Sequence, residues 1–482
     1  MPALLCETVT GRTMAELVAA RDAADAADLV ELRLDGVEDV SVAGALAGRR
    51  RPVIVTCRPV WEGGRYEGAE EHRRALLRQA LDMGAEYVDV EWRAGFDDLI
   101  RDHAARIVIS SHDFAGVPAD LAGRARAMRQ TGAAVIKVAV TAARLTDTLP
   151  LVAVAREGDA VVVGMGAAGV PSRLLATRFG SRWSYGGRGV APGQMPARRM
   201  ADEFRFRAIG PRTSVYGVVG NNVMHSLSPV MHNAAFAAAG LDAVYVPLAA
   251  ADFEDFLVFA DALGIGGASV TVPFKVDALR AAGSADALTR TVGAANTLRR
   301  SGPAWEATNT DVEGFLAPLA SAHAAPLAGA RASVMGAGGA ARAVAVALRS
   351  RGVHVTLHAR RPEQAREVAA ALGVHAGGWP PAPGTWDLLI NTTPVGGATV
   401  PDASPIPGGM LDGRLVYDLT YGRGESPLVR AARKAGCITL DGLAMLVAQA
   451  ERQFEWWTGQ RPRPGVMRDA CGANPPGARD ES

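Results

Sequence analysis

The sequence has few cysteines, and they are not arranged as a disulfide framework. Only four occur in 482 residues, at Cys6, Cys57, Cys437 and Cys471, and no two are closely spaced. Small disulfide-stabilised domains pair their cysteines at short, regular spacings. The scattered pattern favours a reducing compartment, and we expect the protein to be cytoplasmic.

Long apolar runs, excess charge and metal-ligand spacings are also missing. The longest apolar runs are broken by glycine and are too short to span a bilayer, and no signal-peptide pattern begins the chain. Lys+Arg number 51 against Asp+Glu 50, so the charge does not favour nucleic acid or an anionic membrane as a partner. The nine histidines show no spacing such as HExxH, and we expect no metal. The expected partners are small molecules, and the oligomeric state is left open.

Eight short apolar strands alternate with helical stretches over the first 200 residues or so. The stretches between them, such as 70–83 and 119–131, are rich in Ala, Arg and Leu. This alternation predicts an α/β fold that begins with a (β/α)₈ TIM barrel over residues 1–209. The expected strands are 3–6, 29–34, 53–57, 87–90, 107–110, 135–140, 161–165 and 182–185.

A lysine stands in the middle of the β-branched strand 135–140. Lys137 shares a strand face with Val135 and Ala139. A lysine in that position must reach water, pair with an acid or lose its charge, because burial disfavours the ammonium form. A neutral amine is a nucleophile that forms Schiff bases with ketones. The alternative is a lysine whose stem runs along the strand while its amine stays in water.

Further polar residues end or follow the strands of the expected barrel, where reactive groups of this fold gather. They are Glu31 and Arg33 on the second strand, Arg58 after the third, His112 after the fifth and Arg173 after the seventh. A histidine can move a proton near neutral pH, and arginines can hold a carboxylate in a bidentate fork. Each residue alone suits a surface position or an ion pair, but together they form a plausible catalytic set.

These residues lie in motifs that resemble type I 3-dehydroquinate dehydratase over residues 4–206. The motifs are Glu31-Leu-Arg33-Leu-Asp35, Thr56-Cys-Arg58, Ser111-His112-Asp113-Phe114, Lys137, Ser172-Arg173 and Ala191-Pro-Gly-Gln194-Met195. The resemblance implies that Lys137 forms a Schiff base with the substrate ketone. His112 would remove a proton beside the iminium and later protonate the departing hydroxyl, and Arg173 would hold the substrate carboxylate. The residues implied to contact hydroxyls or orient the catalytic pair are Glu31, Arg33, Arg58, Glu62 and Gln194.

A turn cluster, Gly210-Pro211-Arg212, follows a basic helix expected over 197–207 and places a domain boundary near 209–213. Beyond it we expect a strand at 215–219, a helix at 230–239 and a strand at 268–272 that leads to Lys275. Ser226 and Ser228 precede the helix, where they can be simple caps or can bind an anion. The polar stretches 292–297 and 308–311 can be ordinary turns.

A glycine-rich turn joins the expected strand 332–335 to an alanine-rich helix over 340–350. Its sequence, Gly336-Ala-Gly338-Gly339-Ala-Ala341, fits the G-x-G-x-x-A turn of dinucleotide-binding folds. The next strand, 353–357, ends near Arg360 and Arg361, which suit the 2′-phosphate of NADP. The alternative is a basic helix start on a Rossmann-like sheet. Strands 388–391 and 415–418 continue the predicted parallel sheet.

Residues 214–459 resemble shikimate dehydrogenase. The matching motifs are Ser226-Leu-Ser228-Pro229, Val270-Thr271-Val-Pro-Phe-Lys275, Gly293-Ala-Ala-Asn296, Asn309-Thr-Asp311, the glycine turn, Asn391-Thr-Thr393-Pro394 and Asp441-Gly442 through Gln449. The resemblance implies that Lys275 and Asp311 form the catalytic pair, with Lys275 supplying the proton as the ketone is reduced. The implied substrate contacts are Ser226 and Ser228 to the carboxylate, and Thr271, Asn296, Asp311 and Gln449 to the hydroxyls. The implied cofactor contacts are Gly336, Gly338, Gly339, Ala340, Arg360, Arg361, Thr393, Tyr421 and Gly442.

Some positions depart from that family. Asn222 stands where proline is common, Ala359-Arg360-Arg361 replaces an Asn-Arg-Thr run, and the loop after Tyr421 is altered. The second serine of the Ser226/Ser228 pair looks more like shikimate than quinate specificity. The resemblance divides this half into a substrate-binding domain, 210–320 with 441–460, and a Rossmann NADP-binding domain, 321–440. The Pro/Gly/Arg-rich segment 461–482 is expected to be a disordered tail.

Together the two resemblances imply one bifunctional enzyme of the shikimate pathway. The barrel would dehydrate 3-dehydroquinate, and the second half would reduce the product, 3-dehydroshikimate, to shikimate with NADPH. The rivals are a binding protein built from inactive copies of these domains, an enzyme with one inactive half, and a dehydrogenase that prefers quinate. Retention of Lys137, His112, Lys275, Asp311 and the glycine turn argues against the inactive forms.

Overall fold

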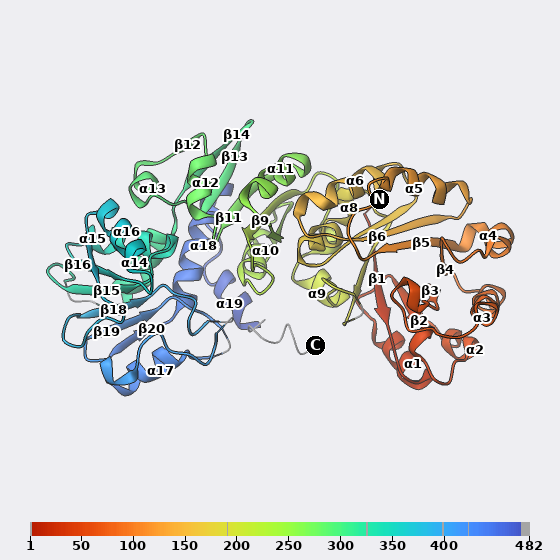
Figure 1. Ribbon diagram of the computed structural model, residues 1–482, viewed down its shortest axis with the longest axis horizontal. Helices are drawn as coiled ribbons and strands as arrows, with labels where there is room; N and C mark the ends of the chain where they lie inside the picture. Colours follow the sequence, from red (N-terminus) through yellow and green to blue (C-terminus); the bar gives the residue numbers. More distant parts are fainter. Residues whose placement is uncertain (1, 190, 324–325, 398–399, 423, 474–482) are drawn as a thin grey trace. The chain divides into compact units, whose positions relative to one another are not determined.

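The protein folds into two compact units. The structure, a computed structural model, describes residues 2–189, 191–323, 326–397, 400–422 and 424–473 (Figure 1). The first unit comprises Met1–Ser214 with Asp242–Gly264, and the second comprises Val215–Leu241 with Ile265–Ser482. None of the described helices is both long and apolar enough to cross a membrane.

Eight parallel strands form a nearly closed barrel in the first unit, as predicted (Figure 1). They are hydrogen-bonded in the order β7-β6-β5-β4-β3-β2-β1-β8. Between β7 and β8 the backbone N–H of Arg182 donates to the Ala160 carbonyl at 2.9 Å. The strands are β1 Leu4–Val9, β2 Leu29–Arg33, β3 Val53–Thr56, β4 Tyr87–Glu91, β5 Ile107–Asp113, β6 Val135–Thr141, β7 Ala160–Met165 and β8 Trp183–Gly187.

Helices surround this barrel and shield strands that are buried on both faces. Apart from β8, whose residues are WSYGG, the strands contain Val, Ile or Leu, and most residues of these strands are buried. Thr13 and Asp120 cap the N-termini of α1 and α5 with their side chains. The helices are α1 Met14–Ala23, α2 Val42–Leu46, α3 Glu70–Asp82, α4 Asp97–His103, α5 Leu121–Gln130, α6 Leu149–Arg156, α7 Val170–Leu174, α8 Ala176–Phe179 and α9 Ala197–Asp202.

The helix expected over 197–207 is shorter than predicted. It ends at Asp202, and Arg205 adopts a left-handed backbone with φ 52°. Phe204 and Phe206 on either side of it are both buried. Residues two apart cannot point to the same side of an α-helix, so burying both rings ends the helix.

The segment Asp242–Gly264 packs with the barrel, although it lies beyond the boundary expected near 209–213. It contains strand β10 (Ala243–Ala249) and helix α11 (Phe253–Leu263). The buried Asp255 carboxylate accepts hydrogen bonds from the backbone N–H groups of Leu145 at 2.9 Å and Thr146 at 3.0 Å, and from the Thr146 hydroxyl at 2.8 Å. These residues begin the 3₁₀ helix η4 (Leu145–Thr148), which follows β6. A carboxylate of α11 therefore caps a barrel loop.

The first sheet of the second unit mixes parallel and antiparallel strands. β9 (Ser214–Gly220) pairs in parallel with β11 (Ile265–Val270), and β11 pairs antiparallel with β13 (Thr297–Ser301). β14 (Ala304–Thr308) and the short β12 (Ser284–Ala285) continue the sheet. Its helices are α10 Ser228–Ala238, α12 Lys275–Ala281 and α13 Ala287–Val292.

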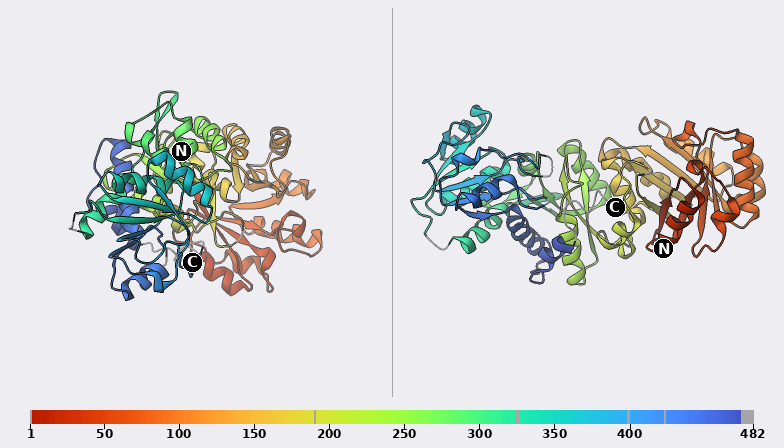
Figure 2. Two further views of the ribbon diagram at one scale, coloured as in Figure 1. Left: turned by 60° about the vertical axis from the view of Figure 1, so that its left-hand side comes forward. Right: turned by 90° about the horizontal axis from the view of Figure 1, so that it is seen from below.

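The second sheet of this unit is parallel throughout and has the Rossmann-type arrangement that was predicted. Its order is β17-β16-β15-β18-β19-β20, so the strand order reverses at β15. Val334 faces a core shared with α14, α15 and α16, whereas Met335 faces a core shared with α17, so helices cover both faces (Figures 1 and 2). The elements are β15 Arg331–Met335, β16 His354–His358, β17 His375–Gly377, β18 Leu388–Asn391, β19 Leu415–Asp418, β20 Ile438–Leu440, α14 Asp311–Ala322, α15 Gly339–Arg349, α16 Pro362–Leu372, α17 Pro427–Lys434 and α18 Gly442–Thr458.

The expectation of a disordered tail over 461–482 is wrong for part of that segment. Helix α19 (Val466–Ala473) forms there and packs against α10. Met467 and Cys471 are both buried, and their i, i+4 spacing places them on one helix face. The burial of these apolar side chains stabilises the helix, although the preceding residues 462–465 are rich in Pro and Gly. Residues 474–482 lie outside the described part of the chain.

Candidate active sites

One cavity of the barrel is lined by every barrel residue singled out in the sequence. Parallel strands bring their carboxyl ends to one rim, so residues far apart in the chain meet there. The residues that converge are Glu31, Arg33, Arg58, Glu62, His112, Lys137, Arg173 and Gln194.

Lys137 lies between two carboxylates inside the barrel. Its Nζ is 3.2 Å from Glu31 Oε1 and 3.1 Å from Asp89 Oδ2, and its side chain is 8% exposed. Hydroxyls of Thr8 and Thr56 donate to the Glu31 carboxylate at 2.8 and 3.0 Å and fix its position. Of the options open to a lysine on this strand, the fold selects pairing with acids. Two adjacent carboxylates also give the amine a short route for losing a proton.

Arg58 neutralises the acids on the other side of Asp89. Its guanidinium is 2.8 Å from Asp89 and 2.7 Å from Glu91, and it donates to the Ser110 hydroxyl at 2.8 Å. Burial pushes the pKa of Asp89 upward, but the charges of Arg58 and Lys137 outweigh burial and hold that pKa well below its usual range. Asp89 is therefore ionised beside the amine at neutral pH.

His112 is a neutral base in this setting. Burial, followed by the positive charge of Arg58, lowers the pKa of His112 to about 4. Its backbone N–H donates to Glu62 Oε1 at 3.0 Å, and its Nδ1 lies 3.8 Å from the same oxygen. The ring stacks on Phe114, with centroids 6.4 Å apart. An unprotonated imidazole that is held in place near an amine can accept a proton from a substrate carbon.

Arg173 differs from the other cations of the cavity. Arg33 forms a bidentate ion pair with Asp35, with both bonds at 2.8 Å, whereas the acceptors of the buried Arg173 among the described residues are carbonyls, those of Tyr185 at 3.2 Å and Pro192 at 3.5 Å. Within the described part of the chain its Nε has no hydrogen-bond partner. Burial lowers its pKa to about 10. A buried guanidinium with no carboxylate beside it is suited to an anionic ligand.

A second cavity lies within the second unit and gathers the residues predicted there. It is bordered by the ends of β9 and β11, the N-terminus of α15 and the helix α18. The predicted residues that line it are Ser226, Ser228, Thr271, Lys275, Asn296, Asp311, Ala340, Thr393, Tyr421, Gly442 and Gln449.

Lys275 and Asp311 are in direct contact in this second cavity. Lys275 Nζ donates to Asp311 Oδ2 at 2.5 Å, and Asn296 Nδ2 donates to Asp311 Oδ1 at 2.8 Å. Asn296 also donates to Gln449 Oε1 at 3.3 Å. Each of the two charged residues begins a helix, α12 and α14, so Asp311 is a helix start and not part of a turn. The arrangement is a lysine–carboxylate pair within a hydrogen-bonded polar wall.

The backbone of the glycine turn lies very close to neighbouring side chains. Gly336 has φ +122°, and a Cβ there would stand 2.3 Å from Thr392 Oγ1. A Cβ on Gly339 would stand 2.7 Å from Lys275 Cδ, whereas Gly338 faces open space. No side chain caps the N-terminus of α15, so its backbone N–H groups can receive a phosphate. Gly336, Gly338, Gly339, Arg360 and Arg361 do not line the second cavity, and both arginines are exposed after β16.

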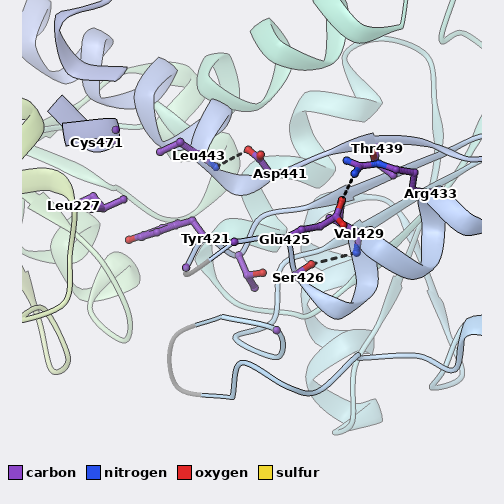
Figure 3. Close-up of a pocket in the computed structure, with 15 residues that line it drawn as sticks. Leu227, Tyr421, Glu425, Ser426, Val429, Arg433, Thr439, Asp441, Leu443 and Cys471 are labelled. Carbon is purple, nitrogen blue, oxygen red and sulfur yellow. Dashed lines mark hydrogen bonds and ion pairs between the residues drawn. The ribbon is translucent and has the colours of Figure 1, made fainter. Parts of the chain in front are cut away.

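A third cavity adjoins the second and shares Thr420 and Tyr421 with it (Figure 3). Its wall includes the ion pair of Glu425 Oε1 with Arg433 Nη1, 2.6 Å apart, and the α17 cap Ser426. Tyr421 thus lies between the second and third cavities, at the edge of the site that the second cavity forms. None of the predicted substrate-binding residues lines this third cavity.

Sequence reasoning missed several residues of the two sites. In the barrel these are Asp89, inside the expected apolar strand 87–90, and Glu91, just after it; both acids belong to β4. In the second unit, Gln453 donates to the Asn296 carbonyl at 3.3 Å and to the Thr297 hydroxyl at 3.0 Å. The available signals were the i, i+2 spacing of the acids and the i, i+4 spacing of Gln453 from Gln449. Among the described residues, no cluster of three or more His, Cys, Asp or Glu could hold a metal ion.

Three family models match the chain. Residues 5–211 match type I 3-dehydroquinase. Residues 218–298 match the shikimate dehydrogenase substrate binding domain, and residues 442–471 match the shikimate 5′-dehydrogenase C-terminal domain. The matched segments contain most residues of both candidate sites.

Individual proteins extend this similarity. A chloroplastic bifunctional 3-dehydroquinate dehydratase/shikimate dehydrogenase of Arabidopsis thaliana is 33% identical, covering 95% of this chain and 82% of the relative. A shikimate dehydrogenase (NADP(+)) of Anaeromyxobacter sp. (strain Fw109-5) is 41% identical over 54% of this chain and 97% of its own. The crystal structure of a shikimate dehydrogenase in complex with NADP⁺ is similar with a TM-score of 0.51 and 32% identity, covering 55% of this chain and 96% of that one.

Proposed function

The chain belongs to the family of bifunctional 3-dehydroquinate dehydratase/shikimate dehydrogenases, and from that premise we propose how each of its two sites works. The barrel dehydrates 3-dehydroquinate to 3-dehydroshikimate, and the second unit reduces this product to shikimate with NADPH. The observation that carries the proposal is the convergence of all eight predicted barrel residues on one cavity, together with the Lys275–Asp311 pair in the other.

In the barrel, Lys137 is the nucleophile that forms an imine with the ketone. Glu31 and Asp89 lie within 3.2 Å of its Nζ and can accept the proton that the amine must lose before attack. Once the imine is protonated, the same carboxylates balance its charge. The protonated imine then withdraws electrons from the neighbouring carbon and makes its C–H bond acidic.

His112 takes that proton and delivers it to the departing hydroxyl. Its lowered pKa, about 4, keeps the imidazole unprotonated at neutral pH. Glu62, 3.8 Å from Nδ1, balances the imidazolium when it forms. Arg173 holds the substrate carboxylate, which replaces the missing counter-ion. The remaining contacts to hydroxyls or to the catalytic pair fall to Glu31, Arg33, Arg58 and Gln194.

In the second unit, Lys275 donates the proton that converts the ketone oxygen to a hydroxyl. Its contact with Asp311 at 2.5 Å holds the amine in the cavity. Ser226 and Ser228 bind the carboxylate at the start of α10, where the Ser226 hydroxyl accepts a hydrogen bond from the Ser228 backbone N–H at 3.1 Å. Hydroxyl contacts are assigned to Thr271, Asn296, Asp311 and Gln449.

The glycine turn fits a dinucleotide. A Cβ at Gly336 or Gly339 would collide with Thr392 or Lys275, so the tight turn requires glycine at both positions, and the uncapped start of α15 provides backbone donors. Arg360 and Arg361 would pair with the 2′-phosphate that distinguishes NADP from NAD. The nicotinamide of NADPH supplies the reducing equivalents when bound. Ala340, Thr393, Tyr421 and Gly442 would border its reactive end, because all four line the substrate cavity.

We further propose the division 1–209, 210–320 with 441–460, and 321–440 for the catalytic barrel, the substrate-binding domain and the NADP-binding domain. The family models follow the same order along the chain, with the first match ending at residue 211 and the last at residue 471. The cytoplasm is the proposed location, in keeping with four buried cysteines that form no disulfide among the described residues.

Two single substitutions test the two-site assignment. Lys137→Ala removes the amine, so it should abolish dehydration of 3-dehydroquinate while leaving reduction of 3-dehydroshikimate intact. Lys275→Ala should do the reverse. The intact site of each variant reports that its own unit is folded, and thermal unfolding of the full-length protein reports on the unit that carries the substitution. If either substitution stops both reactions in folded protein, or leaves its own reaction unchanged, the assignment is wrong.

A further inference from the structure

The ring of Tyr185 faces the amine of Lys137. Nζ lies 4.3 Å from the ring centroid, within the range of a cation–π contact. Tyr185 comes from β8 and is 3% exposed, so the contact is shielded from water. Its hydroxyl is buried and has no hydrogen-bond partner within the described residues. The interaction with the lysine therefore belongs to the ring and not to the hydroxyl.

Neighbouring rings fix the orientation of Tyr185. Trp183, two residues earlier on β8, meets it edge-on, with centroids 6.5 Å apart and an interplanar angle of 72°. Tyr87 of β4 packs on Trp183 at 5.5 Å. These side chains belong to one hydrophobic cluster inside the barrel. The face of Tyr185 is thus held in place before any substrate arrives.

The backbone of Tyr185 holds a second cation. Its carbonyl accepts a hydrogen bond from Arg173 Nη1 at 3.2 Å. One residue thereby contacts both the amine assigned to the ketone and the guanidinium assigned to the carboxylate.

We propose that Tyr185 is a positioning residue of the dehydratase site. Its ring holds the Lys137 nitrogen in place both as the ammonium and as the iminium. This inference rests on the proposed Schiff-base role of Lys137. Glu31 and Asp89 can take a proton from the amine, but the ring cannot. The ring therefore stabilises the ammonium before the reaction and the iminium during it, without competing for the proton.

The scarcity of lysine makes the proposal directly measurable. The chain contains three lysines, Lys137, Lys275 and Lys434. Cyanate carbamylates only unprotonated amines, and peptide mass spectrometry can follow each lysine of the full-length protein separately against pH. In Tyr185→Leu the ammonium of Lys137 loses a stabilising contact, so the midpoint of its carbamylation profile should move about 0.5–1.5 pH units lower. The profile of Lys434 should not move.

Turnover provides the second readout. In Tyr185→Leu, kcat for dehydration should fall roughly 5- to 30-fold, because the iminium also loses the ring. Tyr185→Phe keeps the ring and should retain both the carbamylation profile and kcat. Tyr87→Leu is the matched control, since it removes a ring of the same cluster that does not touch the lysine. Reduction of 3-dehydroshikimate at the other site reports that each variant is folded.

A fluorinated phenylalanine at position 185 keeps the shape of the ring while weakening its negative face. It should reproduce the pH shift of Tyr185→Leu even where the leucine variant folds poorly. A profile for both replacements that superimposes on the wild type would overturn the inference, as would a Tyr87→Leu profile shifted by the same amount. If borohydride with 3-dehydroquinate traps no adduct on Lys137 of the wild-type protein, the proposed function fails first.

Discussion

Replacing Arg173 with methionine is expected to stabilise the protein while disabling the barrel's reaction. Arg173 is 2% exposed, and burial lowers its pKa to about 10. Its hydrogen bonds go to the carbonyls of Tyr185 and Pro192 and not to a carboxylate. The folded chain thus keeps a charge whose cost is offset only when an anionic ligand binds.

The magnitude follows from the pKa. A value about 2.5 below that of a solvated arginine corresponds to roughly 3.5 kcal/mol of unfavourable burial, at about 1.4 kcal/mol per pH unit. Losing the hydrogen bonds to the Tyr185 and Pro192 carbonyls gives back about 1.5 kcal/mol. Methionine should therefore raise the free energy of unfolding by about 2 kcal/mol. Because the pKa is lower in the folded state, this cost is fully present below about pH 10 and falls progressively as the pH rises from 10 to the pKa of a solvated arginine.

Thermal unfolding and steady-state kinetics together check the prediction. The melting temperature of Arg173→Met should rise by a few degrees, while kcat/KM for 3-dehydroquinate should fall roughly 10²- to 10³-fold as the carboxylate loses its partner. Arg33→Met is the matched control, because it breaks the bidentate pair with Asp35 and should lower the melting temperature. A less stable Arg173→Met with an unchanged KM would refute the reasoning.

Three other perturbations follow from the same contacts. Asp255→Ala removes the acceptor for three donors of the loop after β6, so denaturant titration should show a loss of about 3 kcal/mol, and an unchanged midpoint would contradict the capping role. Gly339→Ala puts a Cβ 2.7 Å from Lys275 Cδ and should lower reductase kcat roughly 10-fold or more while dehydration is unaffected; equal loss of both activities would point to misfolding instead. The pKa of His112, about 4, predicts that the dehydratase retains its base down to about pH 5, and that the stability due to this neutral imidazole falls as the pH drops from 6.5 towards 4. A pH–rate limb for kcat/KM near 6.5 would exclude that assignment.

Much of the fold could be predicted from the sequence, because its strands are short apolar runs separated by helical stretches. All eight barrel strands were predicted within a few residues. The misassignments occurred where tertiary burial overrides local pattern. Burial of Phe204 and Phe206 ends α9 early, and burial of Met467 and Cys471 builds α19 in a segment whose composition suggests disorder. The packing of α11 with the barrel depends on a long-range contact of Asp255, which no local pattern reveals.

The candidate sites were predictable to the extent that their residues stand at strand ends or in motifs. Lys137 was conspicuous because a charge interrupts an apolar strand. Asp89 was not predicted as a site residue, because a single acid in a short apolar strand does not indicate that it will contact Lys137 inside the barrel. The contact of Tyr185 with Lys137 joins β8 to β6 and likewise appears only once the barrel closes. The burial of Arg173 away from the described carboxylates could not be predicted either, because it depends on which residues surround its side chain in the folded protein.

The most direct test of the central claim is NADPH consumption by the full-length protein with 3-dehydroquinate as the only organic substrate. Loss of NADPH absorbance with shikimate as the product is predicted, because it requires both sites to act in sequence. Lys137→Ala should consume no NADPH until 3-dehydroshikimate is added. An unchanged NADPH absorbance in the wild-type protein would contradict the claim, and accumulation of the ultraviolet-absorbing enone would then place the failure in the second unit.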